Sequence, residues 1–124
     1  AQQWLSAHNT FRAQYGAQPL TWDSTLASFA SNYANNCVFQ HSGGPYGENL
    51  AMGYSSIAAA VKGWTDEASS YTGGYSSAAG HFTQVVWKST TKLGCGVASC
   101  SSGKIYVCEY DPAGNVLGQF AQNV

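Results

Sequence analysis

The sequence predicts a single α+β domain, in which helices cover the faces of a small antiparallel sheet. Its 124 residues are enough for one hydrophobic core and too few for two, so residues 1–124 are treated as one domain. Apolar residues recur at helical spacing in the first half of the chain, whereas the last third alternates as paired strands do. Helices followed by a strand meander are typical of a layered α+β fold.

The composition excludes several classes of protein. Hydrophobic residues make up 44% and aromatic residues 14%, so the chain is expected to fold. Charged residues make up only 9%, the formal net charge is -1, and no basic run is present, which excludes a nucleic-acid surface. No apolar run is long enough for a transmembrane helix. We expect a monomer from which any signal peptide has already been removed.

Three helices are predicted from apolar residues that recur every three to four positions. The first ends at Gly16, the second begins after the N-cap residue Asp23 and reaches Cys37, and the third runs from about Ser55 to Ser70. The stripes consist of Trp4, Leu5, His8, Phe11, Arg12 and Tyr15, then of Leu26, Phe29, Ala30, Tyr33 and Cys37, then of Ile57, Ala60, Val61, Trp64, Ala68 and Tyr71.

Two glycine-rich segments are predicted to be loops. The first is Gln40–Gly53, and the second covers residues 69–80, which carry no charge and expose two tyrosines. After a turn at Asp111–Asn115, residues Val116–Phe120 are expected to form a last edge strand.

The four cysteines are expected to form two disulfides. If Cys100–Gly103 form a hairpin loop, Cys95 lies directly opposite Cys108, within reach of a cross-strand bridge. Cys100 is then left for Cys37, which is one of the three possible pairings. An even number of cysteines in a small Ser- and Gly-rich chain suits an oxidising compartment, so a secreted protein is predicted. The alternative, a zinc thiolate site, lacks the usual CxxC spacing.

Several polar residues occupy positions where chemistry is conceivable. Glu67 lies three residues after Trp64 and borders the apolar face of the third helix, either as an exposed boundary residue or as a carboxylate held in a cleft. Together with His41, Glu48 and His81 it supplies the groups for a metal site or for acid–base catalysis. Their separations match no local ligand motif such as HExxH, so spacing alone leaves their convergence open.

His8 belongs to a different environment, because it lies on the apolar stripe of the first helix. We interpret it as a hydrogen-bonded core histidine, with Asn9 and Arg12 as structural polar anchors.

Four motifs resemble those of the CAP superfamily, which comprises the cysteine-rich secretory proteins, antigen five and the pathogenesis-related type 1 proteins. They are "HNTFR" (8–12), "GENL" (47–50), "GHFTQVVW" (80–87) and "IYVCEYDPAGN" (105–115), in that order along nearly the whole chain. Without a Cys-rich C-terminal extension, the chain is most similar to the compact plant and fungal type 1 group. Glu109 departs from the last motif, where a neutral polar or basic residue is usual, and we expect it to alter a surface without touching the cleft.

The resemblance implies a three-layer α-β-α sandwich with a central antiparallel sheet and a central cleft. The residues that would converge in the cleft are His41, Glu48, Glu67 and His81. The implied bridges are Cys37–Cys100 and Cys95–Cys108, in agreement with the hairpin register. Two neutral imidazoles, His41 and His81, suit weakly bound Zn²⁺, and the carboxylates nearby would be further ligands or hold a water. No cofactor is expected to be required.

The resemblance also implies a carrier of small hydrophobic ligands. Several relatives bind sterols or fatty acids and act outside the cell in defence, virulence or lipid export. We expect the lipid-binding loop to be the uncharged aromatic segment from Trp64 to Tyr75, where Tyr71 and Tyr75 offer apolar surface. The competing interpretation is a connector whose tyrosines merely cover the core. A receptor or another protein is a further expected partner.

The alternative function is a metal-assisted or Glu/His-dependent hydrolase, a peptidase with Glu67 or Glu48 as general base. This hypothesis has no assigned nucleophile. Ser42 adjoins His41 in sequence, but adjacency is not hydrogen-bond geometry and no GxSxG context is present. No catalytic residue is therefore assigned.

Overall fold

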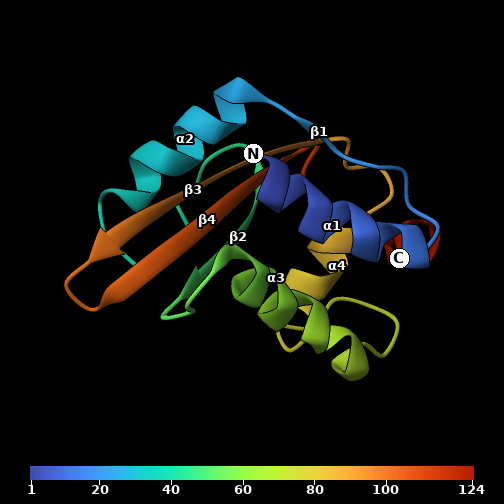
Figure 1. Ribbon diagram of the computed structural model, residues 1–124. Coiled ribbons are helices and arrows are strands. Elements are labelled where there is room, and N and C mark those ends of the chain that lie inside the picture. The colour runs from blue at the N-terminus through green and yellow to red at the C-terminus, as the bar shows by residue number, and fades with distance from the viewer.

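The computed structural model describes residues 1–124 and places a four-stranded sheet between helices on both of its faces (Figure 1). The strand order is β1-β3-β4-β2, with β3 (Lys92–Cys100) and β4 (Gly103–Asp111) in the middle. One edge is β2 (Gly47–Met52), which is antiparallel to β4, and the other is the two-residue β1 (Thr21–Trp22), which is parallel to β3. The predicted three-layer sandwich is confirmed, with one short parallel strand added to the antiparallel sheet.

The β3–β4 hairpin has the predicted register, with Cys95 opposite Cys108. The strands extend further than expected, so that only two residues remain in the turn. Both predicted disulfides are present: Cys95–Cys108 joins Cα atoms 4.1 Å apart, and Cys37–Cys100 joins Cα atoms 5.8 Å apart. The second bridge ties the segment after α2 to the tip of the hairpin.

One face of the sheet is covered by α2 (Ser24–Ala34) alone. The helix lies very close to β3 because two strand residues are glycines. A Cβ atom on Gly94 would lie 2.1 Å from the Ala27 nitrogen, and one on Gly96 would lie 2.5 Å from Ser31 Oγ. The apolar residues enclosed on this face are Ala30, Ala34, Leu50, Ala98, Ile105 and Val107.

The opposite face carries the larger core, under α1 (Gln2–Gln14), α3 (Ile57–Thr65) and α4 (Gly80–Val86) (Figure 1). Its large buried side chains include Trp4, Trp64, Phe82, Leu93, Tyr106 and Tyr110. None of the helices is both long and apolar enough to cross a membrane.

His8 is the buried, hydrogen-bonded histidine that the α1 stripe predicts. Its Nδ1 lies 2.9 Å from the Trp4 carbonyl oxygen and its Nε2 lies 2.7 Å from the Tyr110 hydroxyl. Burial lowers the pKa of His8 to about 4, although the Trp4 hydrogen bond opposes this change. The ring is therefore neutral at pH 7, so Nδ1 donates to the carbonyl and Nε2 accepts from Tyr110.

Arg12 and Asn9 are structural anchors, as predicted. The buried Arg12 guanidinium donates to backbone carbonyl oxygens, and the distances are 2.8 to 3.1 Å. The acceptors are Gln18, Val85, Trp87 and Thr90. Asn9 donates to the Leu20 carbonyl at 3.2 Å and accepts from the Leu20 N–H at 2.7 Å. These bonds fix α1 to the segment that follows it in the chain and to the end of α4.

Two predicted segments differ from the structure in the kind of element they form. The Gln40–Gly53 loop contains β2, because pairing with β4 along six residues outweighs the weak strand propensity of Gly, Glu and Asn. The edge strand expected at Val116–Phe120 is wrong. Gly118 has a φ of +84° and interrupts extended backbone, and the short helix α5 (Phe120–Asn123) packs Phe120 against Trp87 instead.

Two predicted helices also end earlier than expected. The second ends at Ala34, after which Cys37 adopts a φ of +56° that no helix allows. The third ends at Thr65 and continues as the 3₁₀ turn η1 (Asp66–Ser70), which carries Glu67.

Candidate functional site

Three of the four predicted cleft residues line one cavity of about 370 Å³ beside the edge strand β2: His41, Glu48 and His81. A neighbouring cavity of about 230 Å³ is lined by His81 as well, together with Glu67 and with apolar side chains such as Phe39. The two cavities share His81. The four residues thus form two carboxylate–histidine pairs beside β2, in adjoining cavities.

The first carboxylate–histidine pair is Glu48 with His41. Nδ1 of His41 donates to Glu48 Oε1 at 2.9 Å. Glu48 also accepts from the Ser42 N–H at 2.8 Å and from the Ser42 hydroxyl at 2.7 Å. The Glu48 side chain is only 6% exposed, whereas that of His41 is 66% exposed. A buried carboxylate on β2 thus holds an exposed ring from the preceding loop.

The pKa of Glu48 is lowered from its ordinary value. Burial acts in the opposite direction, but the neighbouring carboxyl group of Glu109, the Ser42 N–H and hydroxyl, and His41 together outweigh it. Glu48 is accordingly a carboxylate at neutral pH.

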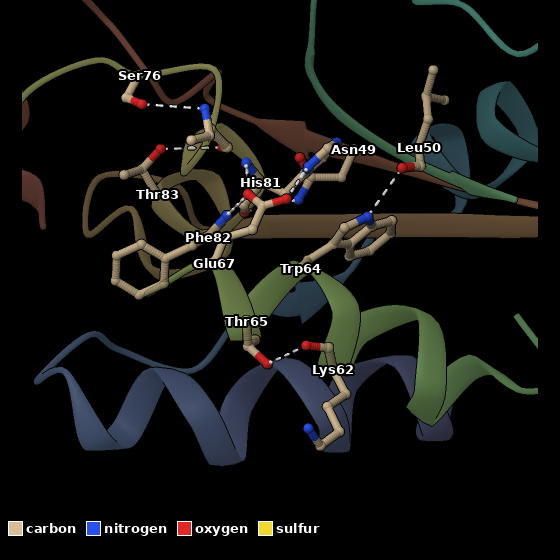
Figure 2. Close-up of polar contacts among 12 residues, drawn as sticks. Asn49, Leu50, Lys62, Trp64, Thr65, Glu67, Ser76, His81, Phe82 and Thr83 are labelled. Carbon is tan, nitrogen blue, oxygen red and sulfur yellow. Dashed lines mark hydrogen bonds and ion pairs between the residues drawn. The ribbon is translucent and has the colours of Figure 1, made fainter. Parts of the chain in front are cut away.

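The second pair is Glu67 with His81 (Figure 2). Nδ1 of His81 donates to Glu67 Oε2 at 2.7 Å. The other oxygen, Oε1, accepts from the backbone N–H groups of His81 at 3.0 Å and Phe82 at 3.3 Å, at the start of α4. Since α4 has no side-chain cap from Ala79, Glu67 satisfies two of its free N–H groups. The His81 ring also stacks on Trp64, with centroids 6.1 Å apart.

Asn49 is a supporting residue that sequence reasoning missed. It is buried, and its amide donates to the His81 carbonyl at 3.1 Å and to the Tyr110 hydroxyl at 3.2 Å. The available signal was its place in "GENL", directly after Glu48, where strand alternation turns Asn49 to the opposite face of the sheet. Asn49 links β2 to the backbone of the cleft histidine.

The two pairs share an arrangement that suits metal binding. Each histidine uses Nδ1 for a carboxylate, and no protein group occupies either Nε2. A carboxylate on the far nitrogen is the usual support of a metal-ligating histidine, because it orients the ring and increases its basicity. No group of three or more His, Cys, Asp or Glu side chains is close enough to hold a metal by itself. The residues present fit a two-histidine site supported by Glu48 and Glu67, whose hydrogen bonds make them partners of the rings.

The arrangement lacks the nucleophile–base pair that a serine hydrolase uses. The Ser42 hydroxyl donates to Glu48 and makes no hydrogen bond to a histidine ring. Its proximity in sequence to His41 is therefore no indication of a catalytic serine.

The predicted lipid-binding residues occupy three different environments. Trp64 is 2% exposed and donates from Nε1 to the Leu50 carbonyl at 3.0 Å (Figure 2). Tyr71 is half-buried against Phe82, with ring centroids 5.7 Å apart. Tyr75 is 57% exposed and lines the cavity that contains His41 and His81. Trp64 and Tyr71 thus cover the core, and Tyr75 is the accessible member of the three.

Glu109 lies where the sequence analysis did not expect it. The prediction that it touches none of the cleft positions is wrong, because β4 places Glu109 directly opposite Glu48 on β2. Glu109 is completely buried, and neither of its carboxyl oxygens has a hydrogen-bond donor. The motif alone could not reveal this position, since it depends on the register of β2 against β4.

A separate apolar groove of about 730 Å³ lies between α1 and α3. Its apolar wall is formed by Ala7, Phe11, Ala58 and Val61. The rim is polar but mostly uncharged, and its one cation is Lys62, which pairs with Asp66 at 2.9 Å. The sequence analysis did not predict this groove, because it requires the pairing of two helices that lie far apart in the chain.

Comparison with known proteins agrees with this architecture. The family model "CAP: Cysteine-rich secretory protein family" matches residues 5–110, and the chain belongs to that family. The chain is 54% identical to "Secreted protein RBT4" of Candida albicans, over 95% of this chain and 36% of the relative. It is 45% identical to "Pathogenesis-related protein 1B" of Nicotiana tabacum, over 95% of this chain and 78% of the relative.

A solved structure has the same fold. The crystal structure of NaASP2 with Zn²⁺ matches with a TM-score of 0.83 and 30% identity, over 94% of this chain and 81% of that one. The curated relatives differ in length: the chain spans little more than a third of RBT4 but over three quarters of the tobacco protein. The shared region is thus the CAP domain.

Proposed function

We propose that this protein is an extracellular, pathogenesis-related type 1-like CAP protein that binds a sterol or a fatty acid in a defence, virulence or lipid-export role. Two disulfides support an oxidising compartment, and a relative with 54% identity is named as a secreted protein. The observation that carries the ligand class is the apolar groove between α1 and α3.

The groove has the size and chemistry of a site for a small hydrophobic ligand. Its volume of about 730 Å³ lies within the usual range of ligand pockets, roughly 300–1,000 Å³. Ala7 and Ala58 leave room between the helices, and Phe11 and Val61 offer apolar surface. The ammonium group of Lys62 at the rim matches the carboxylate of a fatty acid. We therefore place the ligand in this groove.

The segment from Trp64 to Tyr75 stays a prediction for sterol binding. Its accessible apolar surface is centred on Tyr75, since Trp64 and Tyr71 are engaged in packing. The groove and this segment are different surfaces, so substitutions can distinguish them.

The test compares charge substitutions on the two surfaces. Thr10→Asp with Ala58→Asp places two charges at exposed positions in the groove, and we expect affinity for a fluorescent fatty acid or sterol to fall at least tenfold. Ala13→Asp is the matched control, because Ala13 is exposed on α1 and does not line the groove. If only Tyr71→Asp with Tyr75→Asp abolishes uptake, the ligand belongs to the loop. Absence of saturable binding in the wild type would refute the proposed function.

A second candidate function is reversible Zn²⁺ binding in the cleft by His41 and His81. The observation that favours it is that both rings present an unpartnered Nε2 and carry a carboxylate on Nδ1. NaASP2, a structural neighbour, was crystallised with Zn²⁺. Bound zinc would supply a positive charge and Lewis acidity at the edge of β2. Two histidines are fewer than the three protein ligands of most catalytic zinc sites, so the metal is expected to bind weakly and not to be required.

A further inference from the structure

Two acidic side chains lie side by side beneath the cleft. Glu48 on β2 and Glu109 on β4 are direct cross-strand partners, and side chains at such positions have Cβ atoms roughly 5 Å apart. The exposed fraction of Glu109 is 0% and that of the Glu48 side chain is 6%. Two charged carboxylates at this distance and burial would repel each other strongly.

No lysine or arginine offsets this repulsion. Neither glutamate forms an ion pair with a lysine or an arginine. On β3, the residue opposite Glu109 is Gly94, which has no side chain. The titratable groups that face Glu109 from other elements are Glu48 on β2 and Tyr33 at the end of α2, and Tyr110 is its neighbour on β4.

The donors around Glu48 all come from the loop that precedes β2. They are the ring of His41 and the N–H and hydroxyl of Ser42. Glu109 receives no donor at either carboxyl oxygen, although the strand register places it directly beside Glu48. A hydrogen bond between two carboxyl groups needs one proton, and that proton satisfies the otherwise unpartnered Glu109.

We propose that Glu109 is a positioning residue of the cleft, a neutral carboxylic acid whose hydroxyl donates to the carboxylate of Glu48. Glu48 then carries the single negative charge of the pair, and its remaining lone pairs hold His41 and Ser42. The inference depends on the geometry of the pair alone and holds whether or not zinc or a lipid binds.

The titration behaviour of the two groups agrees with this assignment. Burial, followed by the hydrogen bond to Glu48 and its negative charge, raises the pKa of Glu109 to about 10. The pKa of Glu48 is lowered, and Glu109 is among the hydrogen-bond partners that lower it. The pair thus holds one proton across the neutral range, and that proton stays on Glu109.

The proposal has a definite pH signature. Above the ordinary glutamate pKa of about 4.3, the unfolded chain releases the Glu109 proton, whereas the folded protein keeps it. The contribution of protonated Glu109 to the free energy of unfolding is therefore fully present below about pH 4.3 and is lost as the pH rises toward about 10. Relative to Glu109→Gln, the unfolding equilibrium constant of the wild type should rise about tenfold per pH unit in this window.

The experiment measures denaturant unfolding between pH 5 and pH 9 together with infrared difference spectra at pH 7. We expect the wild type to show the carbonyl stretch of a protonated carboxylic acid, and Glu109→Gln to lack it. The glutamine amide still donates to Glu48, so the amide resonance of Ser42 should keep its chemical shift in that variant. In Glu109→Met, which has no donor, the Ser42 resonance should move.

Two further variants make the test decisive. Asp66→Asn changes a carboxylate that is 62% exposed and should leave both the pH slope and the carbonyl band unchanged. Glu48→Gln removes the neighbouring charge, so it should shift the Glu109 titration to lower pH. The proposal is overturned if the wild type has no carbonyl band at pH 7, or if Glu109→Gln has the wild-type pH slope. It is also overturned if added Na⁺ or Ca²⁺ stabilises the wild type but not Glu109→Gln, because a cation would then occupy the pair.

Discussion

The groove between α1 and α3 and the cleft at β2 differ in how they are built. The groove is an apolar gap between two helices, and its one cation, Lys62, lies at the rim. The cleft is polar and is assembled from a strand, a loop, a 3₁₀ turn and a helix start, with hydrogen bonds fixing each imidazole. A neutral gap suits a nonpolar ligand, whereas paired imidazoles and carboxylates suit a metal ion.

The two regions share no lining residue. Trp64 lines the cavity beside His81 and is absent from the groove wall. Its indole stacks on Trp4 with centroids 6.3 Å apart and on His81 with centroids 6.1 Å apart. Because the groove and the cleft have no lining side chain in common, we expect lipid binding and metal binding to be independent of each other.

The largest expected effect concerns the proposed zinc site in the cleft. His41→Ala combined with His81→Ala should weaken zinc binding at least about a hundredfold, since no other protein nitrogen replaces the two Nε2 atoms. Fatty acid affinity should stay unchanged in the same variant. Zinc affinity in the wild type should also fall on acidification, because imidazole must be neutral to bind a metal. Parallel titrations of both ligands, each at neutral and acidic pH, test the separation; a loss of fatty acid affinity together with zinc would break it.

His8 is expected to affect stability without affecting either ligand. The pKa of His8 is about 4 in the folded protein and 6.5 in the unfolded chain. The contribution of the neutral ring to the free energy of unfolding is therefore fully present above pH 6.5 and is lost as the pH falls toward 4. The loss should amount to about 3 kcal/mol. Chemical denaturation at several pH values should show this slope in the wild type and not in His8→Gln. A zinc affinity that changed in His8→Gln at neutral pH would contradict the assignment of His8 to the core.

Both cleft carboxylates should contribute to zinc affinity, and Glu67 should contribute to the stability of the protein as well. Glu48→Gln and Glu67→Gln should each weaken zinc binding by about 10- to 100-fold, because each carboxylate orients a histidine. Glu67→Ala should in addition destabilise the protein by about 1 kcal/mol, since α4 loses the acceptor for its first N–H groups. Calorimetric zinc titration and thermal unfolding check the two effects. Equal stability of Glu67→Ala and the wild type would show that Glu67 does not cap α4.

The smallest expected effect concerns the rim of the groove. Asp66→Asn releases Lys62 from an exposed i,i+4 ion pair, at a stability cost below about 0.5 kcal/mol. The freed ammonium group should raise the affinity for a fatty acid about twofold and leave that for a sterol unchanged, because a sterol has no carboxylate. Competition binding with both ligands measures this difference, and a twofold gain for the sterol as well would exclude a role of Lys62 in recognising the head group.

The sequence was most informative where local patterns agree with tertiary contacts. The hairpin register followed from the turn, and it placed Cys95 opposite Cys108 as the structure does. The apolar stripe of α1 identified His8 and Arg12 as buried. The grouping of the four cleft residues was expected only from the motif resemblance. Spacing alone left it open, because these residues come from elements whose packing the sequence order does not determine.

Features that depend on the pairing of distant segments could not be predicted. β2 has a weak strand signal and forms because β4 offers a partner along six residues. The burial of Glu109 follows from that same register, and the groove follows from the packing of α1 on α3. At Val116–Phe120 the error was to predict a strand that does not form. The composition of this segment is strand-like, but Phe120 lies at the start of a short helix and packs against Trp87.

The most direct test of the central claim is to locate the ligand in the groove by nuclear magnetic resonance. A ¹³C-labelled long-chain fatty acid should show nuclear Overhauser effects to the methyl groups of Ala7, Ala58 and Val61, which line the groove. These effects should persist with a zinc chelator and in His41→Ala with His81→Ala, and they should disappear in Thr10→Asp with Ala58→Asp. Overhauser effects to Tyr75 in place of these methyl groups would contradict the account. So would the absence of any Overhauser effect together with the absence of saturable fatty acid binding.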